Sequence, residues 1–287
     1  MKKFLLWAFV LWFLFPNALL QAQEKKWESL SLKSEPNFEL PALKEQNFAN
    51  GFKLFYLEQS DNPVIEGSIY LPWGKINEPD SAPGVAILSL LSLRQGGSGD
   101  LSPQEFELAL NRLAAQISVE VTWEYGKIDF RCLKEDWEDL LALFQKMLFE
   151  PRWNQERFDI LKKQLIASRK QADDQPEQVA IRYFRQVIYG KNSPWAREAS
   201  VQDYEKLSLE QVKSFYKKSL SFSKAVLGLS SPFSLKKVRK DLSFLGNYKN
   251  PDYDIKQPKP ITKEFKQENV WVKKDVSQAT ILMGHLG

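Results

Sequence analysis

The sequence predicts an α+β fold in which helices cover a mostly antiparallel sheet. Two pairs of strand-like segments are each joined by a short turn, which is typical of β-hairpins. Longer segments with apolar residues at helical spacing lie between and after these pairs. Because strands and helices alternate in this way, each helix can bury its apolar stripe against the sheet. The chain has 287 residues, 43% of them hydrophobic, which is enough for such a core.

The first hairpin is predicted over residues 51–59 and 64–73, because the sequence SDNP between them favours a turn. Pro83 then suits the first turn of a helix over residues 84–95, GVAILSLLSLRQ. This helix is apolar on nearly every side and has no charge before Arg94. A helix that is hydrophobic all round is expected to be buried.

A second helix and a second hairpin follow the loop GGSGD. The helix is predicted over residues 102–115, because Ser102 and Glu105 have the spacing of a capping box. The hairpin over residues 116–125 and 127–133 has an alternating first strand. Further predicted elements are helices over 135–148, 154–172, 176–190, 208–218 and 232–242 and a strand over 223–230.

Composition separates these elements from the rest of the chain. Residues 24–245 are predicted to form one α+β domain. Residues 246–266 contain prolines, lysines and little apolar periodicity, which indicates a linker. Residues 267–287 are predicted to be the first strands of a second, truncated domain. A strand pair cannot bury its face alone, so an exposed strand over 269–284 would promote aggregation unless a partner covers it.

The N-terminus has the features of a secretory signal peptide over residues 1–23. Lys2 and Lys3 precede an apolar run over residues 4–15, and Ala22 is a small residue suited to cleavage nearby. The run is shorter than a membrane-spanning helix requires, so membrane attachment is expected only if the segment stays uncleaved. The sequence therefore predicts export across the inner membrane, into the periplasm.

Charge and cysteine content argue against several classes of function. The net charge is +4, from 40 basic and 36 acidic side chains that are scattered along the chain. This balance argues against a nucleic-acid partner, and the short basic run at 236–240 is interpreted as a solvated helix face. Cys132 is the single cysteine of the sequence, so it has no partner for an internal disulfide, and burial in a strand is expected.

Four segments, taken in order, resemble the insulinase/pitrilysin family of zinc metallopeptidases, which includes mitochondrial processing peptidase. They are GVAILSLLSLRQGG with the helix SPQEFELALNRLAA, the hairpin QISVEVTWEYGKIDF, the stretch from Phe158 to Arg197 that contains YGKNSPWAR, and SQATILMGHLG. The resemblance covers about residues 38–287. It implies the α+β fold of that family, with residues 267–287 beginning a second, homologous half.

The resemblance also indicates where the zinc ligands of an active member would lie. The family motif reads G-L-A-H-x-x-E-H, in which two histidines on one helix face bind zinc and the glutamate accepts a proton from the bound water. Aligned on Gly84, these three roles fall on Ile87, Leu90 and Leu91, which are all aliphatic and are expected to be core. His285 is the one histidine of the sequence, so no other alignment supplies two imidazoles. The chain is expected to be a pseudo-peptidase without zinc or another cofactor.

Other candidate features are interpreted as structural. The third zinc ligand of the family would fall near Glu156 or Asp159, but one carboxylate does not make a zinc site. The loop at 96–100 lacks the Lys-Ser/Thr of a phosphate loop, and Asp173 and Asp174 suit a cap and a turn. Several aromatic side chains could line a peptide groove or belong to the core: Trp73, Trp123, Tyr125, Trp137 and Trp195.

Peptide binding is the activity that survives the loss of zinc. In the active family, substrate adds as a further strand to a sheet edge that is equivalent to about residues 116–122 here. The expected contact residues are Ile117, Ser118, Val119 and Glu120. Some members of the family have two subunits, of which only one carries zinc. The resemblance therefore implies a catalytically active insulinase-family subunit as the partner, in a heterodimer that binds unfolded, extended peptides. The alternative is a stand-alone peptide-binding or envelope-folding protein. A residual enzyme is disfavoured, because no nucleophile–base arrangement is visible.

Overall fold

The computed structural model describes residues 42–251, 269–275 and 278–285. Within them, six strands form one sheet in the order β1-β2-β6-β3-β5-β4. Neighbouring strands are antiparallel except β2 and β6, which are parallel. The strands are β1 (Lys44–Asn47), β2 (Lys53–Glu58), β3 (Val64–Leu71), β4 (Gln116–Val121), β5 (Gly126–Leu133) and β6 (Val226–Ser231). The predicted class, an α+β fold with a mostly antiparallel sheet, is confirmed.

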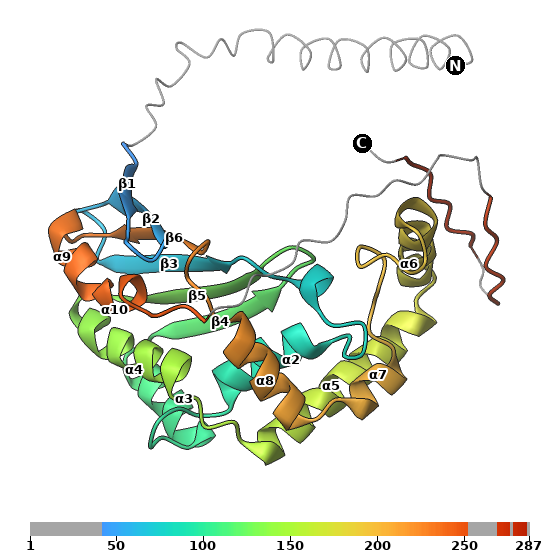
Figure 1. Cartoon of the computed structure of the whole chain (residues 1–287), viewed down its shortest axis with the longest axis horizontal. Coiled ribbons are helices and arrows are strands. Elements are labelled where there is room, and N and C mark those ends of the chain that lie inside the picture. Colours follow the sequence, from blue (N-terminus) through green and yellow to red (C-terminus); the bar gives the residue numbers. More distant parts are fainter. Residues whose placement is uncertain (1–41, 252–268, 276–277, 286–287) are drawn as a thin grey trace, which may run out of the picture. The chain divides into compact units, whose positions relative to one another are not determined.

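Helices cover one face of this sheet (Figure 1). In the described residues the helices are η1 (Lys75–Asn77), α2 (Val85–Gln95), α3 (Pro103–Arg112), η2 (Lys134–Asp136), α4 (Trp137–Phe149), α5 (Gln155–Asp174), α6 (Pro176–Tyr189), α7 (Val201–Lys206), α8 (Leu209–Ser219), α9 (Leu235–Asp241) and α10 (Ser243–Gly246). Most of them begin and end within a few residues of the predicted ranges. The short elements β1, η1, α7 and α10 have no counterpart in the prediction.

The side chains of β3 alternate between the two faces of the sheet. Ile65, Ile69 and Leu71 point toward the helices and are at most 1% exposed. Glu66 and Tyr70 lie on the opposite face and are exposed. This period of two fixes the register, because a shift by one residue would expose the buried set.

The hydrophobic core lies between the sheet and the helices. Its largest fully buried side chains include Trp73, Trp137, Tyr56, Phe52, Phe106, Phe144, Phe158 and Phe222. Two polar tips within it have partners: Trp137 Nε1 donates to Asp241 at 2.9 Å, and the Tyr216 hydroxyl donates to the Leu148 carbonyl at 2.8 Å. Trp73 Nε1 is buried and has no hydrogen-bond partner among the described residues. Two of the aromatic candidates therefore belong to the core. Those that stay partly exposed are Trp123, Tyr125 and Trp195.

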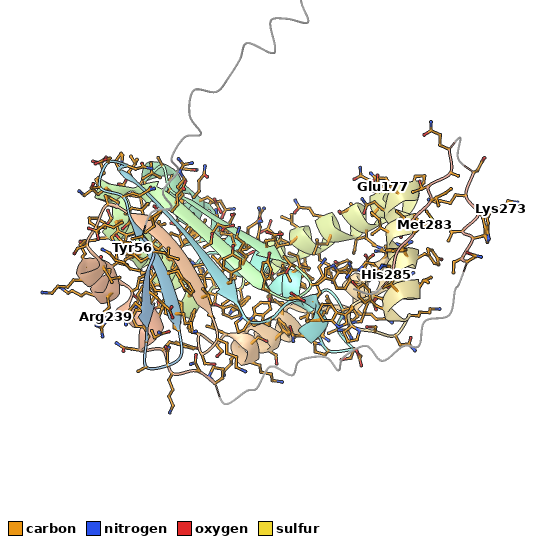
Figure 2. All side chains as sticks on the ribbon, turned by 90° about the horizontal axis from the view of Figure 1, so that it is seen from above. Tyr56, Glu177, Arg239, Lys273, Met283 and His285 are labelled. Carbon is orange, nitrogen blue, oxygen red and sulfur yellow. The ribbon has the colours of Figure 1, made fainter. Side chains whose placement is uncertain are left out.

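Cys132 and the basic run at 236–240 were interpreted as structural, and both lie in structural positions. Cys132 is 2% exposed, and burial raises the pKa of its thiol to about 12, so the thiolate needed for reaction is disfavoured. In the basic run, Arg239 on α9 is exposed and points away from the sheet (Figure 2). Lys237 is held by ion pairs to Glu138 and Asp241, each at 3.0 Å.

The packed part of the chain continues beyond residue 245, where the domain was predicted to end. Asn250 Oδ1 accepts a hydrogen bond from the Phe222 N–H at 2.7 Å. The Tyr248 ring stacks on Phe149, with 5.0 Å between ring centroids. Residues 246–251 therefore complete the core rather than begin a linker.

The described residues test only part of the predicted domain organisation. The signal segment over residues 1–23 lies outside them, as does most of the predicted linker. No residue of the described stretches 269–275 and 278–285 is in a strand, where strands were predicted. Among the described residues, no helix is both long and apolar enough to cross a membrane. A second, homologous domain stays a prediction.

Gly67 in β3 makes room for an aromatic ring of the core. A Cβ atom at this position would lie 2.2 Å from Phe130 Cζ. We expect Gly67→Ala to lower the free energy of unfolding by about 1–3 kcal/mol, because the ring must move within a packed interior. Gly228 in β6 is the matched control, since nothing lies within 4 Å of a Cβ there. Urea unfolding of the three proteins would measure this, and equal effects of the two substitutions would contradict it.

Candidate functional site

Helix α2, which carries the positions of the missing zinc motif, begins at an unusual cap. Gly84 precedes its first residue with a φ of 86°, in the left-handed region that favours glycine. The Glu78 carboxylate accepts hydrogen bonds from the Gly84 N–H at 2.9 Å and the Ala86 N–H at 3.0 Å. These bonds satisfy main-chain donors that have no partner within the helix. A Cβ on Gly84 would also lie 2.5 Å from the Tyr204 ring.

Glu78 is a buried carboxylate that the sequence did not single out. Glu78 is 7% exposed, and burial raises the pKa of its carboxyl group to about 7. The two N–H donors and the positive charge of Arg197 oppose that shift. Arg197 also fixes the loop, because its Nη2 donates to the Glu78 carbonyl at 2.6 Å. No motif signals this cap, because Glu78 acts through hydrogen bonds to main-chain N–H groups that only the folded chain brings close.

The three motif positions differ in burial. Leu90, at the position of the family's glutamate, is 0% exposed. A Cβ on Gly126 would lie 3.2 Å from Leu90 Cδ1, so α2 packs directly on the start of β5. Ile87 and Leu91, at the two histidine positions, are only partly buried and pack against the core. The expectation of core packing therefore holds fully for Leu90, whereas the other two form an apolar surface.

A cavity of about 160 Å³ lies beside Ile87. From α5 it is lined by Leu165, Ser168, Arg169 and Ala172. Glu156 and Asp159, near which a third ligand was expected, are not among its lining residues. Both residues lie in α5 about two turns before this lining. At that level α5 contacts the C-terminal end of α2, where Arg157 Nη2 donates to Gln95 Oε1 at 2.5 Å.

Two arginines, Arg169 and Arg197, belong to the polar lining of this cavity. Arg169 Nη1 donates to Glu198 Oε2 at 2.6 Å, and Arg197 forms an ion pair with Asp80. The pKa of the neighbouring Tyr204 hydroxyl is raised to about 12, chiefly by burial. Arginine side chains and a tyrosine hydroxyl of this kind do not act as a base near neutral pH. The lining carboxylates are already engaged, Glu78 by the N–H groups of Gly84 and Ala86 and Glu198 by Arg169. Within residues 42–251, 269–275 and 278–285, no three His, Cys, Asp or Glu side chains lie close enough to hold a metal ion.

Strand β4, which was expected to bind peptide, lies at one edge of the sheet. At its hairpin turn the Thr122 N–H donates to the Tyr125 carbonyl at 2.9 Å. In an antiparallel pair the hydrogen-bonded positions alternate, so Ser118 and Glu120 direct their main-chain groups toward β5. Ile117, Val119 and Val121 direct theirs outward. Of the four expected contact residues, Ile117 and Val119 therefore offer main-chain groups to an added strand, whereas Ser118 and Glu120 do not. The sequence alone could not distinguish these two pairs.

Both ends of this outward edge are covered. At one end, Arg94 Nε from α2 donates to the Ile117 carbonyl at 2.6 Å. At the other end, the main chain of η1 lies against the hairpin turn, with the Lys75 N–H donating to the Thr122 carbonyl at 3.0 Å. Among the described residues, no group outside the sheet hydrogen-bonds the main chain of Val119 or Val121.

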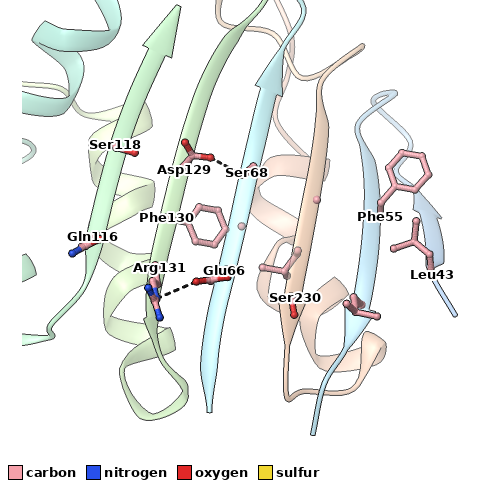
Figure 3. A pocket seen from close by; sticks show the side chains of 14 residues that line it. Leu43, Phe55, Glu66, Ser68, Gln116, Ser118, Asp129, Phe130, Arg131 and Ser230 are labelled. Carbon is pink, nitrogen blue, oxygen red and sulfur yellow. Dashed lines mark hydrogen bonds and ion pairs between the residues drawn. The ribbon is translucent and has the colours of Figure 1, made fainter. Parts of the chain in front are cut away.

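A second hollow, of about 550 Å³, lies on the face of the sheet that the helices leave uncovered (Figure 3). Four of its polar side chains pair with each other: Ser68 Oγ donates to Asp129 at 2.5 Å, and Arg131 forms an ion pair with Glu66 at 3.1 Å. Phe55 adds an apolar wall. A carboxylate alone is too weak a base to activate the Ser68 hydroxyl, so the hollow offers a surface for contact rather than a catalytic pair.

A mostly antiparallel sheet covered by helices, with aliphatic side chains at the motif positions of α2, gives this domain a peptidase-like architecture. No family model matches the sequence. A curated relative, "Non-peptidase homolog YmxG" of Helicobacter pylori, is 24% identical over 240 residues, which are 79% of this chain and 55% of the relative.

Solved structures of proteases and of one inactive peptidase domain share this fold. An M16 inactive domain from Pseudomonas fluorescens has 19% identity and a TM-score of 0.68, over 76% of this chain and 54% of that one. A protease of Helicobacter pylori has 17% identity and a TM-score of 0.67, over 77% and 54% of the two chains. The periplasmic protease PqqL of Escherichia coli has 13% identity and a TM-score of 0.66, over 82% and 27%.

These likenesses confirm the resemblance predicted from the sequence. The chain has the fold of these peptidase structures, and it spans about half the length of the curated relative it matches. The names "non-peptidase homolog" and "inactive domain" of two relatives agree with the aliphatic motif positions.

The buried Glu78 gives a prediction on pH dependence. Its folded pKa is about 7, against an ordinary value of 4.5, so the folded protein binds this proton more tightly than the unfolded chain. The stabilisation is therefore complete below about pH 4.5 and is lost as the pH rises through about 7, with a total of roughly 3 kcal/mol.

We expect Glu78→Gln, which cannot ionise, to lose this part of the pH dependence. Urea unfolding of both proteins at about pH 5 and pH 8 measures it. An unchanged difference in stability between the two pH values in the variant would show that Glu78 does not titrate in this range.

Proposed function

We propose that this protein is a non-catalytic partner of an active M16-type zinc peptidase in the cell envelope. It binds unfolded peptides as an added strand and helps to present them to the metal of the other subunit. The observation that carries the proposal is the open stretch of the β4 edge, beside the helix that has lost its zinc ligands.

Main-chain groups of β4 support the binding of extended peptide. Val119 and Val121 offer an N–H and a C=O each on the outer side of the strand, by the alternation of the β4–β5 pair. A strand added there gains main-chain hydrogen bonds that do not depend on the peptide's side chains. Such a contact suits unfolded segments of varied sequence better than a folded protein surface.

Helix α2 supports the same proposal with an apolar surface. Leu90 faces the start of β5, and Arg94 reaches Ile117 in β4, so α2 passes along the edge strand. Ile87 and Leu91 keep part of their surface exposed on this helix. Alternate side chains of an added strand would point to the side of the sheet that α2 occupies. Aliphatic groups there favour apolar side chains of the peptide.

The need for a partner follows from the chemistry. Hydrolysis by the zinc mechanism requires three protein ligands and a base, and the motif positions Ile87, Leu90 and Leu91 supply none of them. The metal must then come from another chain. A stand-alone peptide-binding or envelope-folding protein remains the second candidate, because the β4 edge by itself is sufficient for binding.

Proline at position 119 tests binding at this edge. The Val119 N–H points outward, so Val119→Pro removes a donor from the open edge without breaking the ladder to β5. We expect at least about a fivefold loss of affinity for a seven-residue peptide of alternating valine and threonine with lysine at both ends, since one bond is lost and the ring obstructs the strand.

Val119→Ala is the matched control, because it also removes the valine side chain but keeps the N–H. Isothermal titration calorimetry measures both variants, and circular dichroism checks that each is folded. Equal affinities of the alanine and proline variants would count against the β4 edge as the binding site.

The partner is tested by isolating the tagged, full-length chain from the cells that make it. We expect a chain with the H-x-x-E-H motif to copurify with it. We also expect Val119→Pro to lower the peptidase activity of the pair. Peptide binding by the protein without any such partner would favour the stand-alone alternative.

A further inference from the structure

Arg94 is held in one position by three neighbours. Its Nε donates to the Ile117 carbonyl at 2.6 Å, and its Nη2 donates to Glu107 Oε2 of α3 at 3.1 Å. Its guanidinium carbon lies 5.7 Å from the centre of the Phe106 ring. The side chain is only 14% exposed, so these contacts are partly shielded from water. Because arginine stays protonated in proteins, the arrangement does not relax when the pH changes.

The carbonyl that Arg94 binds belongs to the outward edge of β4. A residue placed opposite Ile117 in an antiparallel added strand would normally exchange two hydrogen bonds with it. One of those bonds is already made by Arg94. An incoming strand would have to displace a charge-assisted hydrogen bond and the ion pair with Glu107 that supports it.

The opposite end of the edge is closed by main chain. The Ile76 N–H donates to the Trp123 carbonyl at 3.0 Å, next to the bond between Lys75 and Thr122. Gly74 permits this approach, because a Cβ there would lie 2.5 Å from the Trp123 carbonyl oxygen. The open part of the edge is therefore bounded on both sides and contains the outward groups of Val119 and Val121.

We propose that Arg94 is a stop that sets the length and register of the strand that β4 accepts. This inference rests on the proposed function, and it narrows the ligand to a segment paired at Val119 and Val121. Residues of a longer peptide that pass Arg94 leave the sheet and make no ladder bonds. Arg94 is a specificity-determining residue, since it selects the part of an extended chain that is held.

Arg94→Met tests the stop. Methionine keeps an unbranched apolar stem against Phe106 but has no N–H to donate. Two probes are used: the seven-residue valine–threonine peptide, and a three-residue peptide, Val-Thr-Val, with blocked ends. We expect the longer probe to bind about fivefold more tightly to the variant, because the Ile117 pair becomes available. The affinity for the short probe should not change.

Hydrogen exchange of individual amides supplies a readout that a loss of stability alone would not give. In the wild type, we expect the longer peptide to protect the amides of Val119 and Val121 but not that of Ile117. In Arg94→Met, protection should extend to Ile117. The exposed Arg112 of α3 provides the matched control, because Arg112→Met makes the same change of charge away from the edge.

The outcomes separate this inference from the proposed function. If the wild type binds and Arg94→Met shows the same footprint and affinities, the stop is refuted while peptide binding stands. If the variant binds and the wild type does not, Arg94 closes the edge and the proposed function is refuted. If neither binds, both are refuted.

If Arg94→Met does not fold, Glu107→Gln tests the same inference. It weakens the support of Arg94 from a half-exposed position on α3. We expect the same extension of protection to Ile117, with a smaller gain in affinity. No extension in this variant would refute the stop.

Discussion

The aliphatic packing of α2 is the constraint on which the rest of the structure depends. Leu88, Leu90 and Leu93 are all 0% exposed and fix this helix against the sheet. In an active member of the class, the same helix would carry zinc ligands and a glutamate. At Leu90 a carboxylate would be buried among apolar side chains without a partner for its charge, which is strongly unfavourable. The packing that stabilises this domain is therefore incompatible with the metal chemistry at the same positions.

What the domain retains is main-chain chemistry at a sheet edge. Strand β4 ends the sheet, and its outward groups do not require histidines or metal. The edge is also restricted, by Arg94 at one end and by the main chain of η1 at the other. An unrestricted edge is a site for uncontrolled pairing with other chains. Closing both ends leaves a short open stretch, which fits controlled binding of a peptide better than self-association.

Local patterns in the sequence were sufficient for much of the fold. Hairpins and helices follow from turn residues and from apolar spacing, and the capping box of Ser102 and Glu105 is present as predicted. The parallel pairing of β2 with β6 was not predictable in this way, because it joins residues such as Lys53 and Val226 that are far apart in the sequence. Parallel pairing leaves no turn between the strands to mark it.

The site was predictable only in part for the same reason. The identities of Ile87, Leu90 and Leu91 are visible in the sequence, and they determine the loss of zinc ligands. Glu78 and Arg94 were not found, because each acts by hydrogen bonds to main chain that only the folded structure brings close. Main-chain contacts of this kind leave no motif.

We expect this fold to persist without metal chemistry. Zinc content, measured by inductively coupled plasma mass spectrometry on the purified chain, tests it most directly when combined with an assay of hydrolysis of an unfolded protein. We expect neither stoichiometric zinc nor hydrolysis that a chelator abolishes. One tightly bound zinc per chain, together with chelator-sensitive hydrolysis by this chain alone, would contradict it.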